Sequence, residues 1–335
     1  MPGMSSLGGV LTKARINAHI KTAGVFQVEV RETVNSTSSV LREMAAKGAP
    51  EGLVIVAEEQ TAGKGRLGRS FYSPRGHGVY FSILLRPGVK AEDTTLITSA
   101  AAVAAARAIE SVFGVHVGIK WVNDLMLNGK KVCGILTEAT FGAGSSVAES
   151  AILGIGINIS TPAAGFPGEL AGVAASLTDS AGGGGAGRCL VDGDAAADGA
   201  DGWCSAVEDA DGGDADGGDA DGGDADGGDT VAGDAVAGPG GERCRLIASV
   251  LDEFWRFYKN LPAREFLAEY RARSIVLGKE VYVVSGDARK PARALAIDDD
   301  CRLVVRYYNG LARGEPDGMT AALDSGEVSV REVES

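Results

Sequence analysis

The stretch LVIVAEEQTAGKGRLGRSFYSPRGHGVYFSILL, residues 53–85, contains two apolar runs separated by a loop rich in glycine and basic side chains. The runs at 53–57 and 79–85 have the length and the β-branched and aromatic content of buried strands. Proline and glycine in 70–78 prevent a regular helix from opening between the loop and the second run. We therefore predict a strand–loop–strand unit within a sheet.

The loop matches two nucleotide-binding motifs by spacing. Residues 63–68 fit the dinucleotide fingerprint GxGxxG, and residues 63–70 fit a P-loop in which Arg69 replaces the lysine. Both motifs need a helix that begins in the loop, so that its N-terminus faces the phosphates, and no helix is expected here. A third interpretation is that Lys64, Arg66 and Arg69 hold an anionic ligand by charge-assisted hydrogen bonds. A solvated basic hairpin loop is the alternative.

The rest of the chain before residue 272 alternates strands and helices irregularly. Several strands follow one another directly, which favours an α+β class with a mixed central sheet flanked by helices. Further strands are predicted at 26–30, 117–121, 125–127, 132–139 and 151–159, and helices at 40–45 (with the preceding Ser36 or Thr37 as N-cap), 94–113, 244–260 and 263–270.

The last part of the chain has a different character. Short alternating runs are separated by turn residues at 286–287, 298–300 and 309–310. This pattern predicts a small β-barrel or sandwich domain. Its strands are expected at 280–285, 292–297, 303–308 and 327–330.

An acidic low-complexity segment interrupts the folded chain at 181–241. It contains fourteen Asp, one Glu (Glu208) and one Arg (Arg188). The segment therefore accounts for the net charge of −13, and the rest of the chain is nearly neutral. Copies of DGGDA follow one another, with few large apolar side chains, and such a composition favours a disordered surface insertion. A calcium-binding β-helix is the alternative, but that repeat has about nine residues with an apolar position.

Cysteine and histidine argue for an intracellular protein without a zinc site. The five cysteines form no Cys-x-x-Cys pair, and the three histidines lie near none of them in sequence. Free thiols in a reducing compartment are the expected interpretation. Lys13, Arg15 and His19 interrupt the N-terminal region, so it does not resemble a signal peptide, and we expect no membrane-spanning run. We therefore expect a cytoplasmic protein that does not bind a membrane.

Four further motifs accompany the basic loop. Alone, Asn123 and Asp124 could form a turn between strands, and Gly154 and Gly156 could be strand glycines that permit close backbone approach. Together, in this order and spacing, the motifs resemble the biotin–protein ligase family from Phe26 to the end, apart from the acidic insertion. The motifs are NSTS at 35–38, EQTA at 59–62, GKGRLGR at 63–69, KWVNDL with KKVCGILTE at 120–125 and 130–138, and GIGINI at 154–159.

The resemblance implies a fold and a reaction. The fold is a class II synthetase-like catalytic domain at 1–272, including the insertion, and an SH3-like domain at 275–333. The reaction is ATP-dependent activation of biotin to biotinyl-5'-adenylate with Mg²⁺, then transfer to a lysine of a biotin carboxyl carrier protein domain of a carboxylase. A lipoate- or octanoate-protein ligase and a non-catalytic biotin-responsive binding protein remain alternatives.

Site residues are carried over position by position, and no protein ligand is assigned to the metal. The resemblance implies Lys131, Arg66 and Asp124 as catalytic residues, with Asp124 orienting the incoming amine. Asn123 either assists the metal or phosphate or caps the turn. Biotin is assigned to Ser36, Thr37, Ser38, Gln60, Lys64, Gly65, Arg66, Lys131, Gly134, Gly154 and Gly156, and ATP or the adenylate to Arg66, Arg69, Phe71, Asn123, Lys131 and Asn158.

Five positions depart from the family pattern. Lys64 and Leu67 stand where arginine is common, and lysine lacks the bidentate fork of arginine. Phe71 stands for a frequent tryptophan and should still stack on a flat ring. Val122 replaces a usual proline, and Ser38 replaces a usual asparagine, which puts one biotin contact in doubt.

The segment before Phe26 is short. Some members of the family carry an N-terminal winged helix-turn-helix domain, and these residues leave no room for one. We therefore expect a monofunctional ligase that does not bind DNA. The sequence leaves open whether the chain forms a homodimer.

Overall fold

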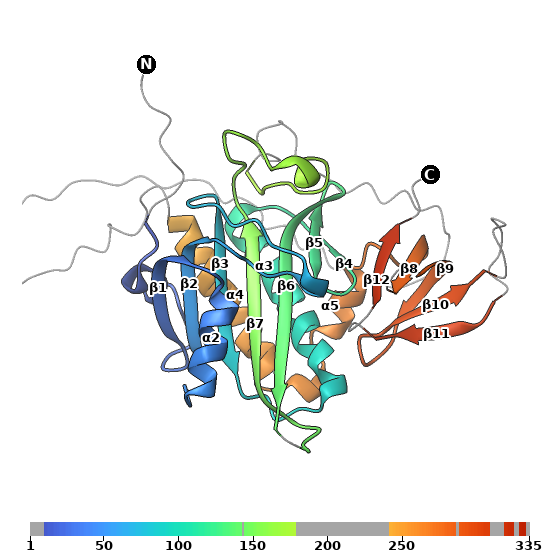
Figure 1. The fold of residues 1–335 in the computed structure, drawn as a ribbon, viewed down its shortest axis with the longest axis horizontal. Helices are drawn as coiled ribbons and strands as arrows, with labels where there is room; N and C mark the ends of the chain where they lie inside the picture. The colour runs from blue at the N-terminus through green and yellow to red at the C-terminus, as the bar shows by residue number, and fades with distance from the viewer. Residues whose placement is uncertain are drawn as a thin grey trace, which may run out of the picture. The chain divides into compact units, whose positions relative to one another are not determined.

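The computed structural model describes residues 10–142, 144–178, 241–285, 288–308, 318–324 and 328–332. Within these residues, a seven-stranded sheet and a five-stranded sheet belong to one compact unit (Figure 1). Residues 181–240 of the expected acidic insertion lie outside the described residues, and so do Cys189 and Cys204. Gly241 is already the first residue of a helix.

The larger sheet has the strand order β1-β2-β3-β7-β6-β5-β4. Strands β1 and β2 pair in parallel, and the other neighbours pair antiparallel, so the predicted mixed central sheet is confirmed. The long β6 and β7 form its centre (Figure 1). The strands are β1 Gln27–Val34, β2 Leu53–Gln60, β3 Gly78–Leu85, β4 Gly118–Lys120, β5 Asp124–Leu127, β6 Lys130–Phe141 and β7 Ala148–Asn158.

Helices cover both faces of this sheet. On one face, α2 (Thr37–Ala46) buries Leu41 against apolar side chains of β2, β3 and β7. On the other face, α3 (Thr94–Phe113) and α4 (Gly241–Tyr258) pack together over the main core. The short α1 (Lys13–Asn17), which the sequence analysis missed, begins after Thr12, whose hydroxyl accepts from the backbone N–H of Arg15 at 3.2 Å.

Helix α3 corrects one expectation. By length and hydropathy it could cross a bilayer, although we expected no apolar run of that kind. In the structure its alanine-rich faces lie in the core, where small side chains let it approach the sheet and α4 closely. The apolar composition of α3 therefore serves packing in the described protein.

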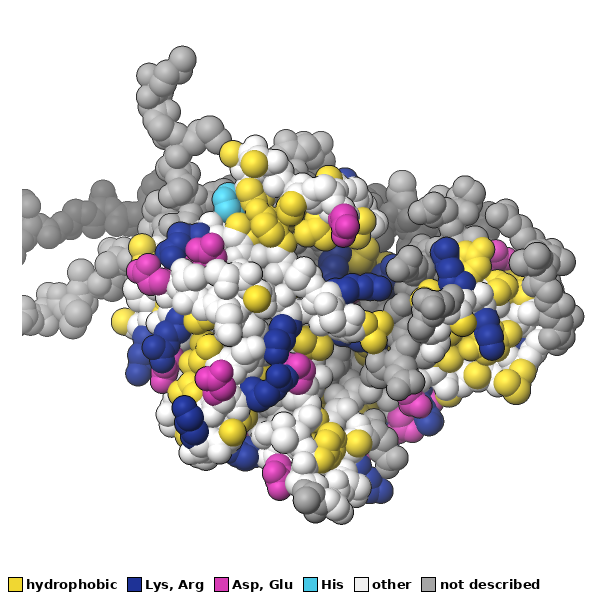
Figure 2. Space-filling model, in the orientation of Figure 1, with side chains coloured by type: hydrophobic (Ala, Val, Ile, Leu, Met, Phe, Trp, Pro, Cys, Tyr) yellow, Lys and Arg dark blue, Asp and Glu magenta, His cyan; other side chains and the backbone are white. Residues whose placement is uncertain are grey.

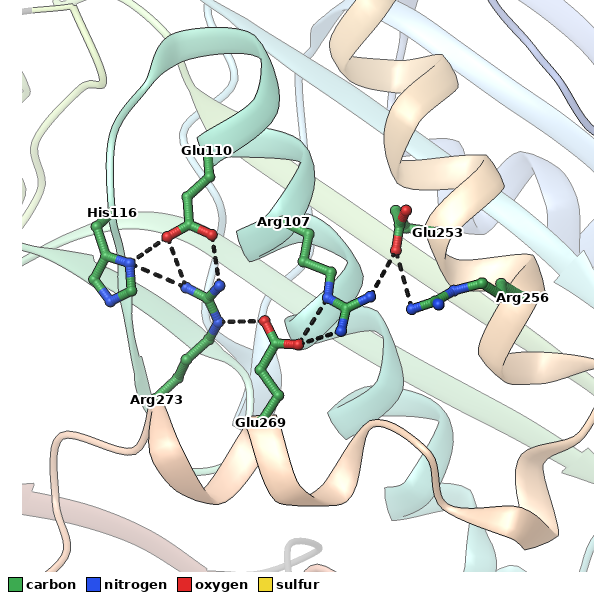
Figure 3. A network of polar contacts seen from close by, with 7 residues as sticks. All are labelled: Arg107, Glu110, His116, Glu253, Arg256, Glu269 and Arg273. Atoms are coloured by element: carbon green, nitrogen blue, oxygen red, sulfur yellow. Dashed lines mark hydrogen bonds and ion pairs between the residues drawn. The ribbon is translucent and has the colours of Figure 1, made fainter. Parts of the chain in front are cut away.

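Ion pairs connect α3 and α4 to α5 (Leu267–Ala272), as Figure 3 shows. Arg107 of α3 donates through Nε to Glu269 Oε2 at 2.7 Å and through Nη1 to Glu253 Oε2 of α4 at 3.2 Å. Arg273, which ends α5 and is only 10% exposed, binds Glu269 Oε1 at 2.7 Å and Glu110 Oε2 at 2.5 Å. The network fixes α5 to both helices of the core face.

The smaller sheet is antiparallel and has the order β11-β10-β9-β8-β12. The expected C-terminal β-structure is therefore present, whereas its closure into an SH3-like barrel stays a prediction. Strand β11 was not predicted, because its TAAL sequence has little β-branched or aromatic content. The strands are β8 Glu280–Ser285, β9 Ala288–Ile297, β10 Leu303–Tyr307, β11 Thr320–Leu323 and β12 Val328–Glu332.

The network at α5 predicts a pH-dependent stability. Burial tends to raise the pKa of Glu269, but hydrogen bonds from Arg107 and Arg273 outweigh it, and the pKa is lowered. The stabilisation is therefore present above the unfolded pKa of about 4.3 and is lost as pH falls through the lower folded value. We expect Glu269→Gln to lower the free energy of unfolding at pH 7 by about 1–2 kcal/mol.

Urea unfolding of both proteins between pH 3 and pH 7 would measure this difference. It should shrink towards zero below the unfolded pKa. Glu43→Gln on the exposed face of α2 is the matched control and should change stability by less than about 0.5 kcal/mol at every pH. A pH-independent loss for Glu269→Gln would contradict the assigned role of its charge.

Candidate active site

A cavity of about 40 Å³ lies on the α2 face of the larger sheet, where the basic loop meets β6 and β7. This volume is far below the roughly 300–1,000 Å³ of most small-molecule sites. The cavity nevertheless unites segments that are distant in sequence. Of the residues predicted for the site, those that line it are Ser36, Thr37, Ser38, Gln60, Lys64, Gly65, Arg66, Phe71, Asn123, Lys131, Gly134, Gly154 and Gly156.

One end of the cavity is a chain of hydroxyl and amide groups. Ser82 of β3 lies 2.7 Å from the Thr37 hydroxyl and 3.0 Å from the Ser38 hydroxyl. Gln60 donates through Nε2 to the Ser73 hydroxyl at 2.9 Å, and its Oε1 accepts from the Thr37 hydroxyl at 3.2 Å. These groups can both donate and accept, so this end suits a neutral polar ligand group.

The start of α2 differs from the prediction in one detail. Ser36 occupies the N-cap position, but its side chain makes no capping hydrogen bond. Instead, Gln60 Oε1 accepts from the backbone N–H of Thr37 at 2.9 Å. Ser36 is therefore the N-cap residue, as predicted, but Gln60 of β2 supplies the capping hydrogen bond.

The basic loop folds back on itself. The backbone N–H of Gly65 donates to Arg69 O at 2.7 Å, and that of Phe71 donates to Gly63 O at 2.9 Å. Only a short 3₁₀ turn, Arg66–Gly68, lies inside the loop, and β3 follows at Gly78. The predicted absence of a regular helix after the loop is confirmed, so neither nucleotide-binding motif has its required context.

A charged cluster forms the other end of the cavity. Arg66 Nη1 donates to Asn123 Oδ1 at 3.1 Å, and Lys131 Nζ lies 2.6 Å from Asp124 Oδ1. Burial lowers the pKa of Arg66, which the Asp124 carboxylate opposes, and a guanidinium keeps its charge in either case. Two cations against one carboxylate leave this end positive, which suits an anionic ligand.

Phe71 covers the two glycines between these ends. A Cβ built on Gly156 would lie 2.5 Å from Phe71 Cε1, and one on Gly134 would lie 3.1 Å from Phe71 Cε2. The Lys131 Nζ atom lies 6.0 Å from the centre of the Phe71 ring. We expected these glycines to admit a ligand, whereas here they admit an aromatic ring. A ligand larger than the cavity therefore requires Phe71 to move.

Three predicted residues lie outside the cavity lining. Arg69 is exposed on the loop. Asn158 is buried and donates through Nδ2 to Ala175 O at 3.2 Å. Asp124 joins the site only through its ion pair with Lys131.

The segment that follows β7 was missed by the sequence analysis. Lys131 exchanges backbone hydrogen bonds with Val173 and Ala175 of this segment, at 2.8 and 2.9 Å. Figure 2 shows apolar side chains gathered over this segment, with Lys and Arg side chains beneath them. The rings of Tyr72, in the loop, and Phe166, in this segment, lie with their centres 6.5 Å apart. The segment therefore borders the charged end of the cavity.

Several lining residues were also missed. Ser82 lies behind the lining as the hydrogen-bond partner of Thr37 and Ser38, and its fully buried hydroxyl within the apolar strand VYFSILL was a usable signal. Phe81, Ile135, Leu136 and Ile155 also line the cavity. In sequence they cannot be told apart from core residues.

None of the residues predicted for the site is a cysteine. Cys133, Cys244 and Cys301 are free and buried, as predicted for reduced thiols. Burial raises the pKa of Cys133, beside Lys131, and raises that of Cys301 to about 11. These thiols therefore stay protonated and unreactive at neutral pH.

The chain is similar to a known family and to solved structures. Residues 30–158 match the model of the "Biotin/lipoate A/B protein ligase family". The bifunctional ligase/repressor BirA of Bacillus subtilis is 41% identical over 175 residues, which is 52% of this chain and 53% of the relative. The biotin–[acetyl-CoA-carboxylase] ligase of Mycobacterium tuberculosis is 33% identical over 147 residues, 41% of this chain and 51% of the relative. The chain thus spans about half the length of these curated relatives.

The fold comparison covers more of the chain. A biotin protein ligase from Aquifex aeolicus, solved in complex with biotin and ATP, has a TM-score of 0.60 at 21% identity and covers 92% of this chain and 99% of its own. At this identity the likeness establishes a shared fold alone. The larger sheet and the C-terminal sheet therefore belong to an architecture already seen in solved structures.

The contact between Phe71 and the glycines predicts a coupled pair of mutations. Gly156→Ala places a methyl group against the ring, so it should lower the free energy of unfolding by about 1–3 kcal/mol. In a Phe71→Ala background the same substitution should cost much less, with a coupling energy of about 0.5–3 kcal/mol. Urea unfolding of the four proteins measures the cycle, and additive effects would contradict the contact. Gly172→Ala, which has no heavy atom within 4 Å of its Cβ, is the control.

Proposed function

We propose that the chain is a biotin–protein ligase, and the starting point is the match of residues 30–158 to the model of the biotin/lipoate A/B protein ligase family. The observation that supports this most is the two-ended cavity. A neutral hydroxyl-rich end and a cationic end meet across glycines on one sheet face. Biotin has the matching chemistry, because a neutral ureido ring and a carboxylate stand at its two ends.

The ring end of biotin would bind among the hydroxyl and amide groups. Ser36, Thr37, Ser38 and Gln60 can donate to the ureido oxygen and accept from the ureido N–H groups. Gly154, whose Cβ would lie 2.7 Å from Ser38 Oγ, keeps this end open. Serine at 38 provides a shorter polar group than the usual asparagine of the family.

The first step would join the biotin carboxylate to ATP. A carboxylate oxygen attacks the α-phosphorus, a new O–P bond forms, and the bond to pyrophosphate breaks. The carboxylate is already ionised at neutral pH, so no general base is required. Arg66, Lys131, Lys64 and the backbone of Gly65 would hold the reacting groups and the charge that develops on phosphate oxygens.

The nucleotide would lie between the loop and the segment after β7. We propose that Arg69 and Phe71 close over it and that Asn123 and Asn158 bind its polar groups. The described residues contain no cluster of three His, Cys, Asp or Glu side chains for a metal. Mg²⁺ would therefore be held mostly by the phosphates and water, with Asp124 and Asn123 as the nearest protein oxygens.

The second step would transfer biotin to a protein. A lysine amine of a biotin carboxyl carrier protein domain attacks the mixed anhydride, an amide bond forms, and AMP leaves. Asp124 would orient this amine, which requires its ion pair with Lys131 to open. We further propose a cytoplasmic location, a catalytic domain at 1–272 and an SH3-like domain at 275–333.

An acceptor assay tests the proposal. The chain is incubated with biotin, ATP, Mg²⁺ and a carboxylase carrier domain, and the carrier is probed with avidin. Labelled carrier is expected, and a carrier whose acceptor lysine is replaced by arginine should remain unlabelled. Transfer of lipoate or octanoate instead of biotin would indicate the alternative ligase. Biotin binding without pyrophosphate release would indicate a non-catalytic binding protein.

Arg66 should contribute more to the retention of the reaction intermediate than to the stability of the fold. Arg66→Ala removes charge-assisted hydrogen bonds of about 1.5–3 kcal/mol, so biotinyl-adenylate should dissociate about 10–150 times faster. Dissociation of labelled adenylate measures this effect, and thermal unfolding measures stability. Arg31→Ala, at an arginine whose side chain is 51% exposed on β1, is the control and should change neither. Equal losses of adenylate retention and stability in Arg66→Ala would contradict the assigned role.

A further inference from the structure

Helix α5 contacts three different parts of the fold. Glu269, in its middle, and Arg273, its C-cap, join the ion-pair network with α3 and α4 (Figure 3). Arg271 donates through Nε to Ile297 O at 2.8 Å and reaches Asp299 Oδ1 at 2.7 Å, at the end of β9. Tyr270 points in a third direction, towards the segment that carries the charged end of the cavity. The helix is therefore a fixed support.

The Tyr270 hydroxyl binds the backbone directly before the site residues. The side chain is completely buried, and its Oη donates to Val122 O at 3.0 Å. Burial raises the pKa of Tyr270, so the hydroxyl stays protonated and remains a donor. Val122 is itself 1% exposed, and Asn123 and Asp124 follow it in the chain.

The same backbone segment is held from a second side. Trp121 Nε1 donates to Cys301 O at 2.9 Å, in the turn between β9 and β10. Cys301 has a φ of 61°, in the left-handed region. Arg264 binds Asp300 of that turn at 2.8 Å. The C-terminal sheet and α5 together therefore fix both residues that precede Asn123.

We propose that Tyr270 is a positioning residue, whose hydroxyl orients the Val122–Asn123 peptide so that Asn123 meets Arg66 and Asp124 meets Lys131. The inference rests on the proposed function. Without this donor the buried Val122 carbonyl loses its partner, and Asn123 is then held mainly by its hydrogen bonds to Ile135, which leave the Val122–Asn123 peptide less well fixed. A rotation there displaces both following side chains, which make contacts of 3.1 and 2.6 Å to the two cations.

The inference predicts a split between binding and chemistry. Tyr270→Phe removes only the hydroxyl. We expect kcat for biotin-dependent pyrophosphate release to fall about 10–100-fold, because small misplacements of reacting groups have effects of that size. The affinity for biotin in the absence of ATP should fall much less than kcat, because the ring of biotin binds the hydroxyl-rich end on α2, β2 and β3 and only its carboxylate meets the two cations.

Tyr258→Phe is the matched control. Tyr258 of α4 donates its hydroxyl to Glu51 Oε1 at 2.7 Å, away from the cavity lining. This variant also loses one tyrosine hydrogen bond, so thermal unfolding should show a loss of stability, while kcat stays within about 2-fold of the wild type. Assays are run well below the unfolding temperature of every variant.

A second variant makes the test independent of Tyr270. Trp121→Phe removes the hydrogen bond to Cys301 O and should reproduce the fall in kcat with a much smaller loss of biotin affinity. The inference is overturned if both Tyr270→Phe and Trp121→Phe keep the wild-type kcat, or if Tyr258→Phe loses as much activity as they do. Wild-type protein without biotin-dependent pyrophosphate release would refute the proposed function instead, which separates the two failures.

Discussion

The register across the larger sheet is the constraint on which the site depends. Asp124 of β5 lies opposite Gly134 of β6, and Gly134 lies opposite Gly156 of β7. Lys120 of β4 and Tyr80 of β3 extend this row on either side. Directly opposed residues point to the same face, so a shift of one residue in any pair would turn part of the row towards α3 and α4. The pairing therefore fixes where charge, open space and aromatic cover lie.

The helices on the other face stabilise that register, and through α5 they also contact the segment that leads into the candidate site. α3 is packed so closely that alanine fills most of its buried positions. The ion-pair network then locks α5 against α3 and α4, and α5 delivers Tyr270 beneath the segment that connects β4 and β5. Packing on the core face thus reaches the candidate site through the hydrogen bond from the Tyr270 hydroxyl to the Val122 carbonyl, although none of these helices lines the cavity.

Local patterns in the sequence predicted the elements well where residue chemistry is distinctive. The apolar run of β3, the alanine-rich α3 and the charged loop with its glycines were all recognised. Strand β11 was missed because alanine and threonine give a weak strand signal. The N-cap residue of α2 was predicted, but the group that makes its capping hydrogen bond was not, because Gln60 reaches it from a strand that only the fold brings near. Likewise, nothing in the sequence indicates that Phe71 lies over Gly134 and Gly156, since that contact depends on the path of the loop.

The position of Phe71 has a consequence for affinity. In the proposed site the Phe71 ring occupies space that the ligand needs, so the protein would bind only from the fraction of molecules in which the ring has left. The apparent dissociation constant is then the intrinsic value divided by that fraction. A second molecule that binds only the open arrangement raises the affinity for the ligand without contacting it. By linkage, the bound ligand raises the affinity for that second molecule by the same factor. The position of the aromatic ring over Gly134 and Gly156 therefore couples two binding equilibria. A macromolecular partner that stabilises the open arrangement raises the affinity for the small molecule, and the small molecule raises the affinity for that partner.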